Sequence, residues 1–409
     1  MTLAGSLEHA VHQGANDLRL MRHIHLETNA FFGIGASSQL PALLSARRLI
    51  RPSVIIDGGV AALPTTDALV AGWKAQGLSV VKVFRARSTQ EPDYAYLDES
   101  ADAFRSVDTD VIIGIGGGSA LDLAKGVALL LRNSGPSLQY RGMDRVMHPG
   151  VPVVLIPTTA GSGSEVTATA SFIDRTTRTK LGINGRHVSC LFSVLDPALL
   201  TSCPVSVTVG SGLDALVHAI EAVTATTAHT VSVLFGVEAV RLLFAGLPAA
   251  IREPADLEAR ANTLLGSHYA GMAMRNVGGG PASGISYPLG VHYAVPHGFA
   301  GGILLPHVVA FNVARGYGSG YARLYERLDG KASASAEDEM EKAKAFRDEL
   351  SSLHQTIGAP PTLGRWGVGR KEIARLTDLT MAERKANLDV NPVPCDRDAV
   401  TELLHAVTE

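Results

Sequence analysis

Three side chains in the second half of the sequence could together hold a metal ion. Asp214 and His218 stand four positions apart in the segment GLDALVHAIEA, and His297 follows in a Pro-His-Gly sequence. Residues four apart lie on one face of a helix, so the first two side chains could reach a single ion. An aspartate with histidines suits a divalent transition metal. Taken one at a time, each is more commonly a hydrogen-bonded core residue.

A glycine-rich segment in the first half could bind a phosphate. GIGGGSALDLAK, at 114–125, follows a strand-like run and opens a helical one. Glycines let backbone amides approach a phosphate closely, and a helix N-terminus favours negative charge. The segment is not the G-x-G-x-x-G fingerprint, because Ser119 stands at the last glycine, and a tight structural turn is the plainer interpretation. A second polar turn, PTTAGSGSEVT at 157–167, follows a later strand, and ends of parallel strands are where doubly wound sheets bind ligands.

Asp57 ends an earlier strand-like run. A carboxylate there could accept hydrogen bonds from an adenosine ribose and would repel a 2′-phosphate. On its own, Asp57 is more readily interpreted as a turn or cap residue.

Two patterns divide the chain and predict what positions these residues. Residues 1–30 form a polar extension with little periodicity. Apolar runs of four to seven residues then alternate with helical patterns, which predicts a doubly wound, Rossmann-like α/β domain over 31–204. The apolar spacing over 205–409 is helical throughout and predicts an all-α domain. Strand runs are expected at 52–57 and 78–84, at the start of the segment 109–131, where a glycine turn and a helix follow, and at 151–159.

Composition excludes several classes of protein. The 409 residues carry a net charge of −3, with 46% hydrophobic and 18% charged residues and no basic cluster for nucleic acid. The three cysteines form no C-x-x-C pair, which argues against a disulfide framework or a cysteine zinc site. No apolar run reaches the roughly 18 residues of a membrane-spanning helix, and the N-terminus does not read as a secretory signal. A cytoplasmic protein with a small-molecule substrate is therefore expected.

Five motifs give the sequence a specific resemblance. GGGSALDLAK, PTTAGSGSEVT, DPALL, GSGLDALVHAIEA and PLGVHYAVPHGFAGGILLPHVVAFN follow one another between residues 31 and 312. In this order and spacing they resemble the iron-containing (group III) alcohol dehydrogenase family, which shares its architecture with dehydroquinate synthase. The resemblance implies a nucleotide-binding α/β domain, a helical C-terminal domain, a cleft between them, and a homodimer formed through the N-terminal domain.

The resemblance also implies roles for individual residues. Asp214, His218 and His297 correspond to metal ligands of the family, and relatives with an aspartate matching Asp57 tend to use NAD. NAD(H) is therefore favoured over NADP(H). The residues expected to bind the cofactor are Asp57, Gly116, Gly117, Gly118, Ser119, Asp122, Thr158, Thr159, Ser162 and Lys180.

Two positions depart from the family's pattern. Ser283 stands where the family has a fourth metal ligand, a histidine, and Tyr287 replaces a second histidine close to the substrate. Changes in residues that only orient metal ligands typically cost ~10–100-fold in affinity, and losing a ligand should cost more. Water could complete a weaker site, or the site could be empty, as in the maleylacetate reductases of this fold, which are generally described as metal-independent. We predict a metal-free enzyme rather than one that depends on Fe²⁺ or Zn²⁺.

Without a metal, another group must stabilise the developing alkoxide. Tyr287 is the obvious candidate donor, with His292 and His297 as alternatives, although Tyr287 could equally fill the volume of the absent imidazole. The leading hypothesis is an NAD(P)-dependent oxidoreductase of a small polar aldehyde, ketone or alcohol. The alternatives are a reductase of an activated C=C bond, as in the maleylacetate reductases, and a non-catalytic nucleotide-binding homologue. A different use of the dinucleotide, as in glycerol-1-phosphate dehydrogenase or dehydroquinate synthase, is disfavoured because the motif sets differ.

Overall fold

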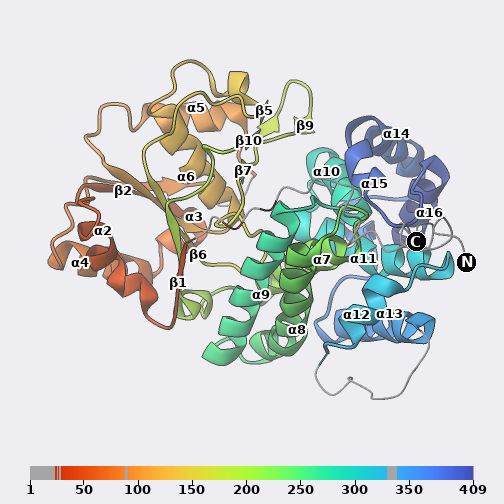
Figure 1. Cartoon of the computed structure of the whole chain (residues 1–409). Helices are drawn as coiled ribbons and strands as arrows, with labels where there is room; N and C mark the ends of the chain where they lie inside the picture. Colours follow the sequence, from red (N-terminus) through yellow and green to blue (C-terminus); the bar gives the residue numbers. More distant parts are fainter. Residues whose placement is uncertain (1–23, 25, 27–28, 88–90, 329–338, 409) are drawn as a thin grey trace, which may run out of the picture. The chain divides into compact units, whose positions relative to one another are not determined.

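A computed structural model of the chain describes residues 24, 26, 29–87, 91–328 and 339–408. Most of the predicted extension at 1–30 therefore lies outside the described residues. The chain forms two compact units (Figure 1). The first comprises Glu27–Pro204 with Pro254–Leu264, and the second comprises Val205–Glu253 with Leu265–Glu409.

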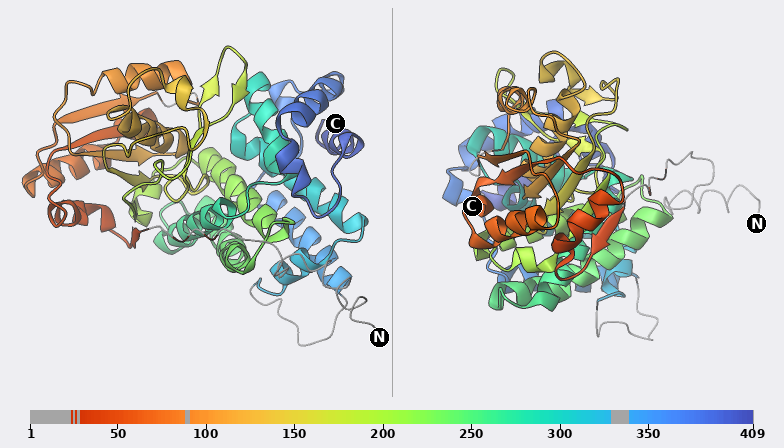
Figure 2. Two further views of the ribbon diagram at one scale, coloured as in Figure 1. Left: turned by 45° about the horizontal axis from the view of Figure 1, so that its top comes forward. Right: turned by 90° about the vertical axis from the view of Figure 1, so that its left-hand side faces the viewer.

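The first unit is built on a six-stranded parallel sheet, which confirms the predicted α/β fold (Figures 1 and 2). The strand order is β1-β11-β6-β4-β2-β3. The chain runs from β2 outward to β3 and then returns to β4 on the other side of β2. The carboxyl ends of β2 and β4 therefore form the switch point at which doubly wound sheets bind ligands. The strands are β1 (Ala30–Phe32), β2 (Pro52–Asp57), β3 (Lys82–Ala86), β4 (Val111–Gly116), β6 (Val153–Pro157) and β11 (Phe192–Leu195).

Side chains alternate across this sheet into two separate cores. On β4, Ile112 packs with α5 (Tyr94–Asp102) and α6 (Gly118–Leu130), while its neighbour Ile113 joins the opposite core. That second core contains buried residues of α2 (Leu40–Ser45) and α4 (Pro64–Ala75). Burial on both faces explains why the central strands appear in the sequence as continuous apolar runs. The short α3 (Gly58–Ala61) follows β2 directly.

One predicted strand boundary is wrong. A strand was expected over 78–84, but β3 begins at Lys82. The amide of Leu78 donates to the carbonyl of Trp73 and closes the end of α4, while the amides of Ser79 and Val81 donate to the carbonyls of Ile50 and Pro52 ahead of the regular ladder. Five two-residue strands lie between β4 and β11: β5 (Gly142–Met143), β7 (Thr169–Ala170), β8 (Ile173–Asp174), β9 (Thr179–Lys180) and β10 (Ile183–Asn184).

The second unit is helical, as predicted. One apolar cluster runs through its helices, from Val209 to Val407. Two helices, α8 and α11, are long and apolar enough to cross a membrane by length and composition, yet 56% and 61% of their apolar windows are buried. Core helices of soluble proteins pass the same test, so this observation assigns no membrane segment. The helices are α7 (Val205–Thr224), α8 (Thr230–Arg252), α9 (Leu257–Arg275), which begins in the first unit and enters the second at Leu265, α10 (Pro281–Tyr293), α11 (His297–Ala314), α12 (Ser319–Tyr325), α13 (Glu339–Thr356), α14 (Ile373–Glu383), α15 (Lys385–Asp389) and α16 (Arg397–Val407).

Candidate active site

Asp57 and the glycine turn meet at the switch point of the sheet. Gly116, the last residue of β4, has a φ of 147°, and a Cβ added there would lie 2.5 Å from the Cβ of Asp57. Only glycine permits this approach. The carboxylate of Asp57 accepts a hydrogen bond of 2.7 Å from the Gly59 amide and caps α3, while burial raises the pKa of Asp57. Asp57 thus has the cap role that its sequence suggested, at the place expected for a ribose contact.

The two predicted phosphate turns are in direct contact. The Thr158 amide donates to the carbonyl of Gly116 over 3.0 Å. A Cβ added to Gly118 would lie 2.6 Å from the Ser162 hydroxyl, whereas one added to Gly117 would meet Thr159 at an ordinary 3.4 Å. Gly117 is the N-cap of α6 and gives that helix no side-chain cap. Ser119 lies in the first turn of α6. The arrangement leaves a helix N-terminus without a capping side chain beside a second polar turn, as anion sites require.

Asp122 holds these turns together. Its carboxylate accepts hydrogen bonds from the Ser164 hydroxyl, at 2.6 Å, and from the Ser171 amide, at 2.9 Å. The buried ammonium of Lys125 lies 3.1 Å from the same carboxylate and donates to the Ser164 and Thr169 carbonyls. The LDLAK part of the first motif therefore fixes the shape of the second turn.

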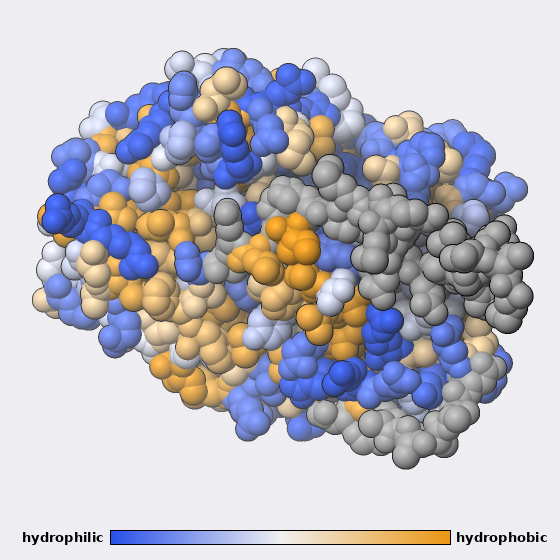
Figure 3. Space-filling view, in the orientation of Figure 1, coloured by the Kyte–Doolittle hydropathy of each residue, from blue (hydrophilic) through white to orange (hydrophobic). Residues whose placement is uncertain are grey.

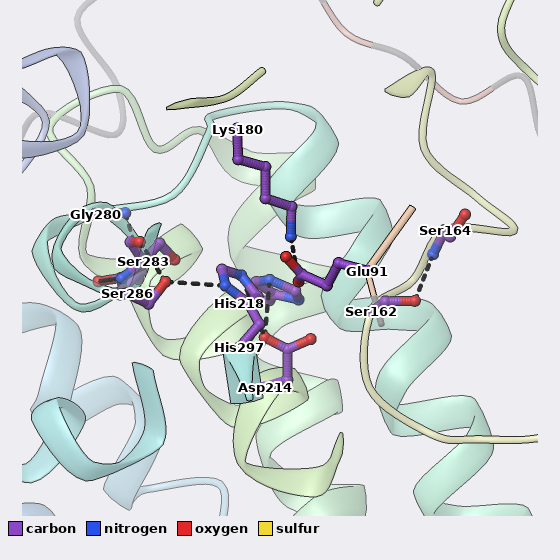
Figure 4. A network of polar contacts seen from close by, with 11 residues as sticks. Glu91, Ser162, Ser164, Lys180, Asp214, His218, Gly280, Ser283, Ser286 and His297 are labelled. Carbon is purple, nitrogen blue, oxygen red and sulfur yellow. Dashed lines mark hydrogen bonds and ion pairs between the residues drawn. The ribbon is translucent and has the colours of Figure 1, made fainter. Parts of the chain in front are cut away.

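Lys180, the predicted cofactor lysine, lies on β9 of the first unit. Its ammonium forms an ion pair of 2.6 Å with Glu91, drawn in Figure 4. The Lys180 side chain is 11% exposed and that of Glu91 is 30% exposed, so the pair is only partly shielded from solvent.

Asp214, His218 and His297 come together in the second unit (Figure 4). Asp214 and His218 lie one turn apart on α7, and His297 is the first residue of α11. The Nε2 atoms of His218 and His297 lie 3.6 Å and 3.8 Å from Oδ1 of Asp214. Ligand atoms bound tetrahedrally at 2.0–2.2 Å are about 3.3–3.6 Å apart, close to both His–Asp distances, and the three ligand atoms all lie within 4.8 Å of one another. The three side chains could therefore close on one divalent metal.

Ser286 orients the ring of His297. Its hydroxyl donates to the carbonyl of Ser283 over 2.6 Å and lies 3.1 Å from Nδ1 of His297. A serine has one hydroxyl hydrogen, so towards His297 it can only accept. The network therefore puts the proton of His297 on Nδ1 and leaves the Nε2 lone pair directed at Asp214 and His218, as in metal-binding histidines.

The other ring nitrogen of His218 has a separate environment. Nδ1 is buried and has no hydrogen-bond partner among the residues that the structure describes. It points away from the Nε2 that faces Asp214, so it calls for a nearby water on that side of the ring rather than for the same ion.

The hydroxyl of Ser283 is hydrogen-bonded to a neighbouring carboxylate. Its hydroxyl donates over 2.5 Å to Glu221, a buried residue of α7. The same carboxylate accepts the amides of Gly280, Ala282 and Ser283, at 2.7 to 3.4 Å, and Pro281 between them has no amide hydrogen. Glu221 thus caps α10 from another helix. Burial raises the pKa of Glu221, and the four donors oppose that rise.

Tyr287 lies between His297 and an arginine. Its ring centroid is 5.1 Å from that of His297, in an edge contact, and the guanidinium of Arg384 lies 3.8 Å from the same centroid. His292, the third predicted catalytic residue, lies one to two turns further along α10, where Nδ1 is 3.3 Å from a guanidinium nitrogen of Arg375. The structure thus brings Tyr287 to His297 and places His292 against an arginine.

Three residues of this region were not predicted. Glu221 has a signal in the sequence, because it stands three positions after His218 and shares its helix face. Ser286 stands one position before Tyr287 on α10, but nothing local shows that its hydroxyl reaches His297. Arg384 is 97 positions from Tyr287, and only tertiary packing joins them.

Comparison with known proteins covers nearly the whole chain. The sequence model described as "Iron-containing alcohol dehydrogenase" matches residues 27–197. The model described as "Fe-containing alcohol dehydrogenase family, C-terminal" matches residues 208–408.

Individual relatives agree with these matches. The chain is 32% identical to long-chain-alcohol dehydrogenase 1 of Geobacillus thermodenitrificans, over 88% of this chain and 90% of the relative. It is 29% identical to the NAD-dependent methanol dehydrogenase of Bacillus methanolicus, over 87% and 92%. The crystal structure of sulfoacetaldehyde reductase from Bifidobacterium kashiwanohense in complex with NAD+ superposes with a TM-score of 0.84 and 25% identity, covering 95% of this chain and 99% of that one. The chain therefore belongs to the iron-containing alcohol dehydrogenase family and is an oxidoreductase.

Proposed function

We propose that this enzyme transfers a hydride between NAD(H) and a small polar aldehyde or ketone, or the corresponding alcohol. The observation that carries the proposal is the convergence of Asp214, His218 and His297, with the ring of Tyr287 against His297. Two of the relatives described above use or bind NAD according to their names. The nicotinamide, when bound, supplies or accepts the hydride. Side chains of this chain hold the substrate oxygen and move its proton.

The preference for NAD over NADP rests on Asp57. Its carboxylate stands at the switch point beside the glycine turn, and only one of its oxygens is used in capping Gly59. A negative charge there would repel the additional phosphate of NADP(H) and accept a ribose hydroxyl of NAD(H).

The proposed metal status rests on Ser283. Asp214, His218 and His297 would hold Fe²⁺ or Zn²⁺ through one oxygen and two nitrogens, and a bound ion would polarise the substrate carbonyl. The fourth position offers only a hydroxyl whose hydrogen is committed to Glu221. We therefore propose that an ion is held weakly and that turnover does not require one.

Metal analysis tests this part of the proposal. Purified protein should contain well under one iron or zinc per chain, and chelator should leave turnover unchanged. Ser283→His should raise the affinity for Zn²⁺, because the other three ligands are already in place. Stoichiometric iron together with loss of activity to chelator would overturn the metal-independent reaction.

Tyr287 is the proposed proton donor to the substrate oxygen. A phenol can stabilise or protonate a developing alkoxide, and the Tyr287 ring is held between His297 and Arg384. Steady-state kinetics of aldehyde reduction by Tyr287→Phe test this role, with an expected loss of ~10²-fold in kcat. Full activity of the variant would make the tyrosine a space-filling residue.

We also propose that the protein is a homodimer formed through the first unit. β1 is an edge strand, and Phe32 and Ile34 near it are 45% and 65% exposed. In Figure 3 apolar side chains gather on the face that carries β1. Light scattering that gave the mass of one chain at micromolar concentration would refute the dimer.

A further inference from the structure

Gly298 brings the start of α11 against α7 at the level of the candidate metal ligands. It follows His297 directly, and a Cβ added to it would lie 2.0 Å from the carbonyl oxygen of Gly210 and 3.1 Å from the Cβ of Asp214. An ordinary contact between a carbon and a carbonyl oxygen is about 3.3–3.6 Å. Both neighbours belong to α7, and the oxygen is part of its backbone. The two helices can therefore approach this closely only because residue 298 has no side chain.

The same face of α11 continues against α7 one turn further on. A Cβ added to Gly302 would lie 2.5 Å from the Cβ of Leu213, whereas one added to Gly301 would meet a methyl group of Val217 at 3.4 Å. The three glycines thus differ in how much room they leave and in what they face. Gly298 lies against the candidate ligand Asp214, whereas Gly301 and Gly302 lie against apolar side chains.

The segment that leads into His297 leaves little room for adjustment. α10 ends at Tyr293 and α11 begins at His297, so the connection comprises only 294–296. Ala294 has a φ of 54°, in the left-handed region that residues with a side chain rarely adopt, and its amide donates to a carbonyl of α10 over 3.1 Å. Pro296, the N-cap of α11, has its φ fixed by its ring. A displacement of the start of α11 would therefore carry His297 with it.

We propose that Gly298 is a positioning residue for His297, because the contact of its backbone with α7 sets the distance from the His297 ring to Asp214. Nε2 of His297 lies 3.8 Å from Oδ1 of Asp214 (Figure 4). A methyl group at position 298 would separate the two helices by roughly 1 Å. The same displacement would disturb the edge contact between His297 and Tyr287. The inference rests on the proposed function in taking these side chains as the place where the carbonyl is reduced.

Cobalt binding tests the position of His297 without relying on turnover. Co²⁺ is the probe, because its visible absorption reports the geometry of its ligands. Ser283→His is the parent protein, because it should bind a divalent metal more tightly than wild type. Adding Gly298→Ala to this parent should weaken Co²⁺ binding by at least ~10-fold and change the absorption spectrum, as loss of ligand orientation does. A parent protein that binds no Co²⁺ overturns the arrangement on which the proposal depends.

Two variants on the same helix are the matched controls. Gly302→Ala overpacks the same interface one turn away from His297, so it should lower the urea midpoint as Gly298→Ala does but leave the Co²⁺ affinity and spectrum of the parent unchanged. Gly301→Ala makes an ordinary contact and should change neither property. Equal losses of Co²⁺ affinity in Gly298→Ala and Gly302→Ala, or no loss in Gly298→Ala, would show that Gly298 only supports packing and would overturn the proposal.

Gly210→Ala keeps the test open if Gly298→Ala does not fold. Its Cβ would meet the ring of Phe299 at 2.9 Å, so it places a milder wedge between the same turns of α7 and α11. Its Co²⁺ affinity in the Ser283→His parent should fall below that of Gly302→Ala. An affinity equal to that of the parent overturns the proposal.

Steady-state kinetics separate this inference from the proposed function. With NADH and glycolaldehyde, Gly298→Ala alone should lower kcat by ~100-fold, the loss that a displacement of about 1 Å can cause, whereas Gly302→Ala should stay close to wild type. If wild type reduces none of a panel of small polar aldehydes while the Co²⁺ contrast holds, the proposed reaction is overturned and the positioning role is supported. Equal kcat values for Gly298→Ala and Gly302→Ala overturn the role of Gly298 in the reaction.

Discussion

The helices α6 and α10 both begin with backbone amides that carry partial positive charge and have no cap from the preceding residue, and the two N-termini are treated differently. Each helix begins after a glycine that offers no capping side chain, Gly117 for α6 and Gly280 for α10. At α10 a carboxylate from α7, Glu221, accepts the amides at the start of the helix. At α6 the N-cap residue supplies no capping side chain in the part of the chain that the structure describes, and the polar turn at 157–167 lies alongside instead. A helix N-terminus attracts an anion in both cases. In one the anion belongs to the chain, and in the other we propose that it belongs to the cofactor.

The largest effect is expected from closing the start of α6. Gly118→Val should weaken NADH binding by at least ~100-fold, because its branched side chain would occupy the space in which a phosphate must approach the helix. It should also lower stability, since even its Cβ would lie 2.6 Å from the Ser162 hydroxyl. Fluorescence titration with NADH and thermal unfolding measure the two effects.

Gly117→Ala is the control for that experiment. Its Cβ would meet Thr159 at 3.4 Å, an ordinary contact, so the variant should unfold at nearly the wild-type temperature. NADH affinity of Gly118→Val close to that of wild type would show that the turn is structural and the cofactor assignment wrong.

Removing the carboxylate of Glu221 from the start of α10 should lower the free energy of unfolding. Glu221→Gln replaces one acceptor oxygen with an NH₂ group that faces backbone donors, so we expect a loss of ~2–4 kcal/mol in the free energy of unfolding. Ser283→Ala removes one of the donors and should cost about 1 kcal/mol. Urea denaturation measures both losses. A Glu221→Gln variant as stable as wild type would mean that the carboxylate is not the capping anion.

The effect on cofactor choice should be smaller. Asp57→Gly should raise the affinity for NADPH relative to NADH by ~10-fold, because the carboxylate no longer repels the 2′-phosphate. The variant also loses the cap of α3, which should cost roughly 1 kcal/mol of stability. Asp396→Gly, which removes the cap that accepts the Ala399 amide at α16, is a matched control that should leave cofactor preference unchanged. No gain in NADPH binding for Asp57→Gly, or a wild-type preference for NADPH, contradicts the assignment.

The smallest effect is expected in the pH dependence of folding stability. His354 is buried on α13 with its ring nitrogens 2.9 Å and 3.0 Å from the carbonyls of Leu350 and Gly302, and burial lowers the pKa of His354 below 6.5. The unfolded chain therefore binds a proton more readily at this residue, so its contribution to stability is present above pH 6.5 and is lost as the pH falls through the lower folded pKa. Urea midpoints between pH 8 and pH 5 should fall less in His354→Gln than in wild type. Parallel curves for the two proteins would show that the residue does not titrate in this range.

Strands buried on both faces and long amphipathic helices were predictable from sequence because their spacing is local. β2 occupies the predicted span 52–57, and α7 begins directly after the predicted change at Pro204. β1 and β11 were missed because three or four residues carry too little periodicity. The start of β3 was misplaced because the end of α4 uses the amide of Leu78.

The residues of the candidate site likewise fall into those predictable from local spacing and those whose contacts depend on tertiary packing. Asp214 and His218 share a helix, so their proximity follows from spacing alone, and the Pro-His-Gly motif added His297 through the resemblance. The roles of Ser283 and Tyr287 depend on Glu221 and Arg384, which reach them from other helices. No pattern in a single sequence encodes such contacts, because each is made by packing after the elements have formed.

The cap that Glu221 places on α10 consists only of atoms of the chain. It ties the helix that presents Ser286 and Tyr287 to the helix that presents Asp214 and His218, whatever else is bound. The other residues of α10 therefore need not supply a cap for its N-terminus. If Tyr287 is the proton donor that we propose, a change of the side chain at position 287 would alter the reaction while the Glu221 cap kept the helix in place.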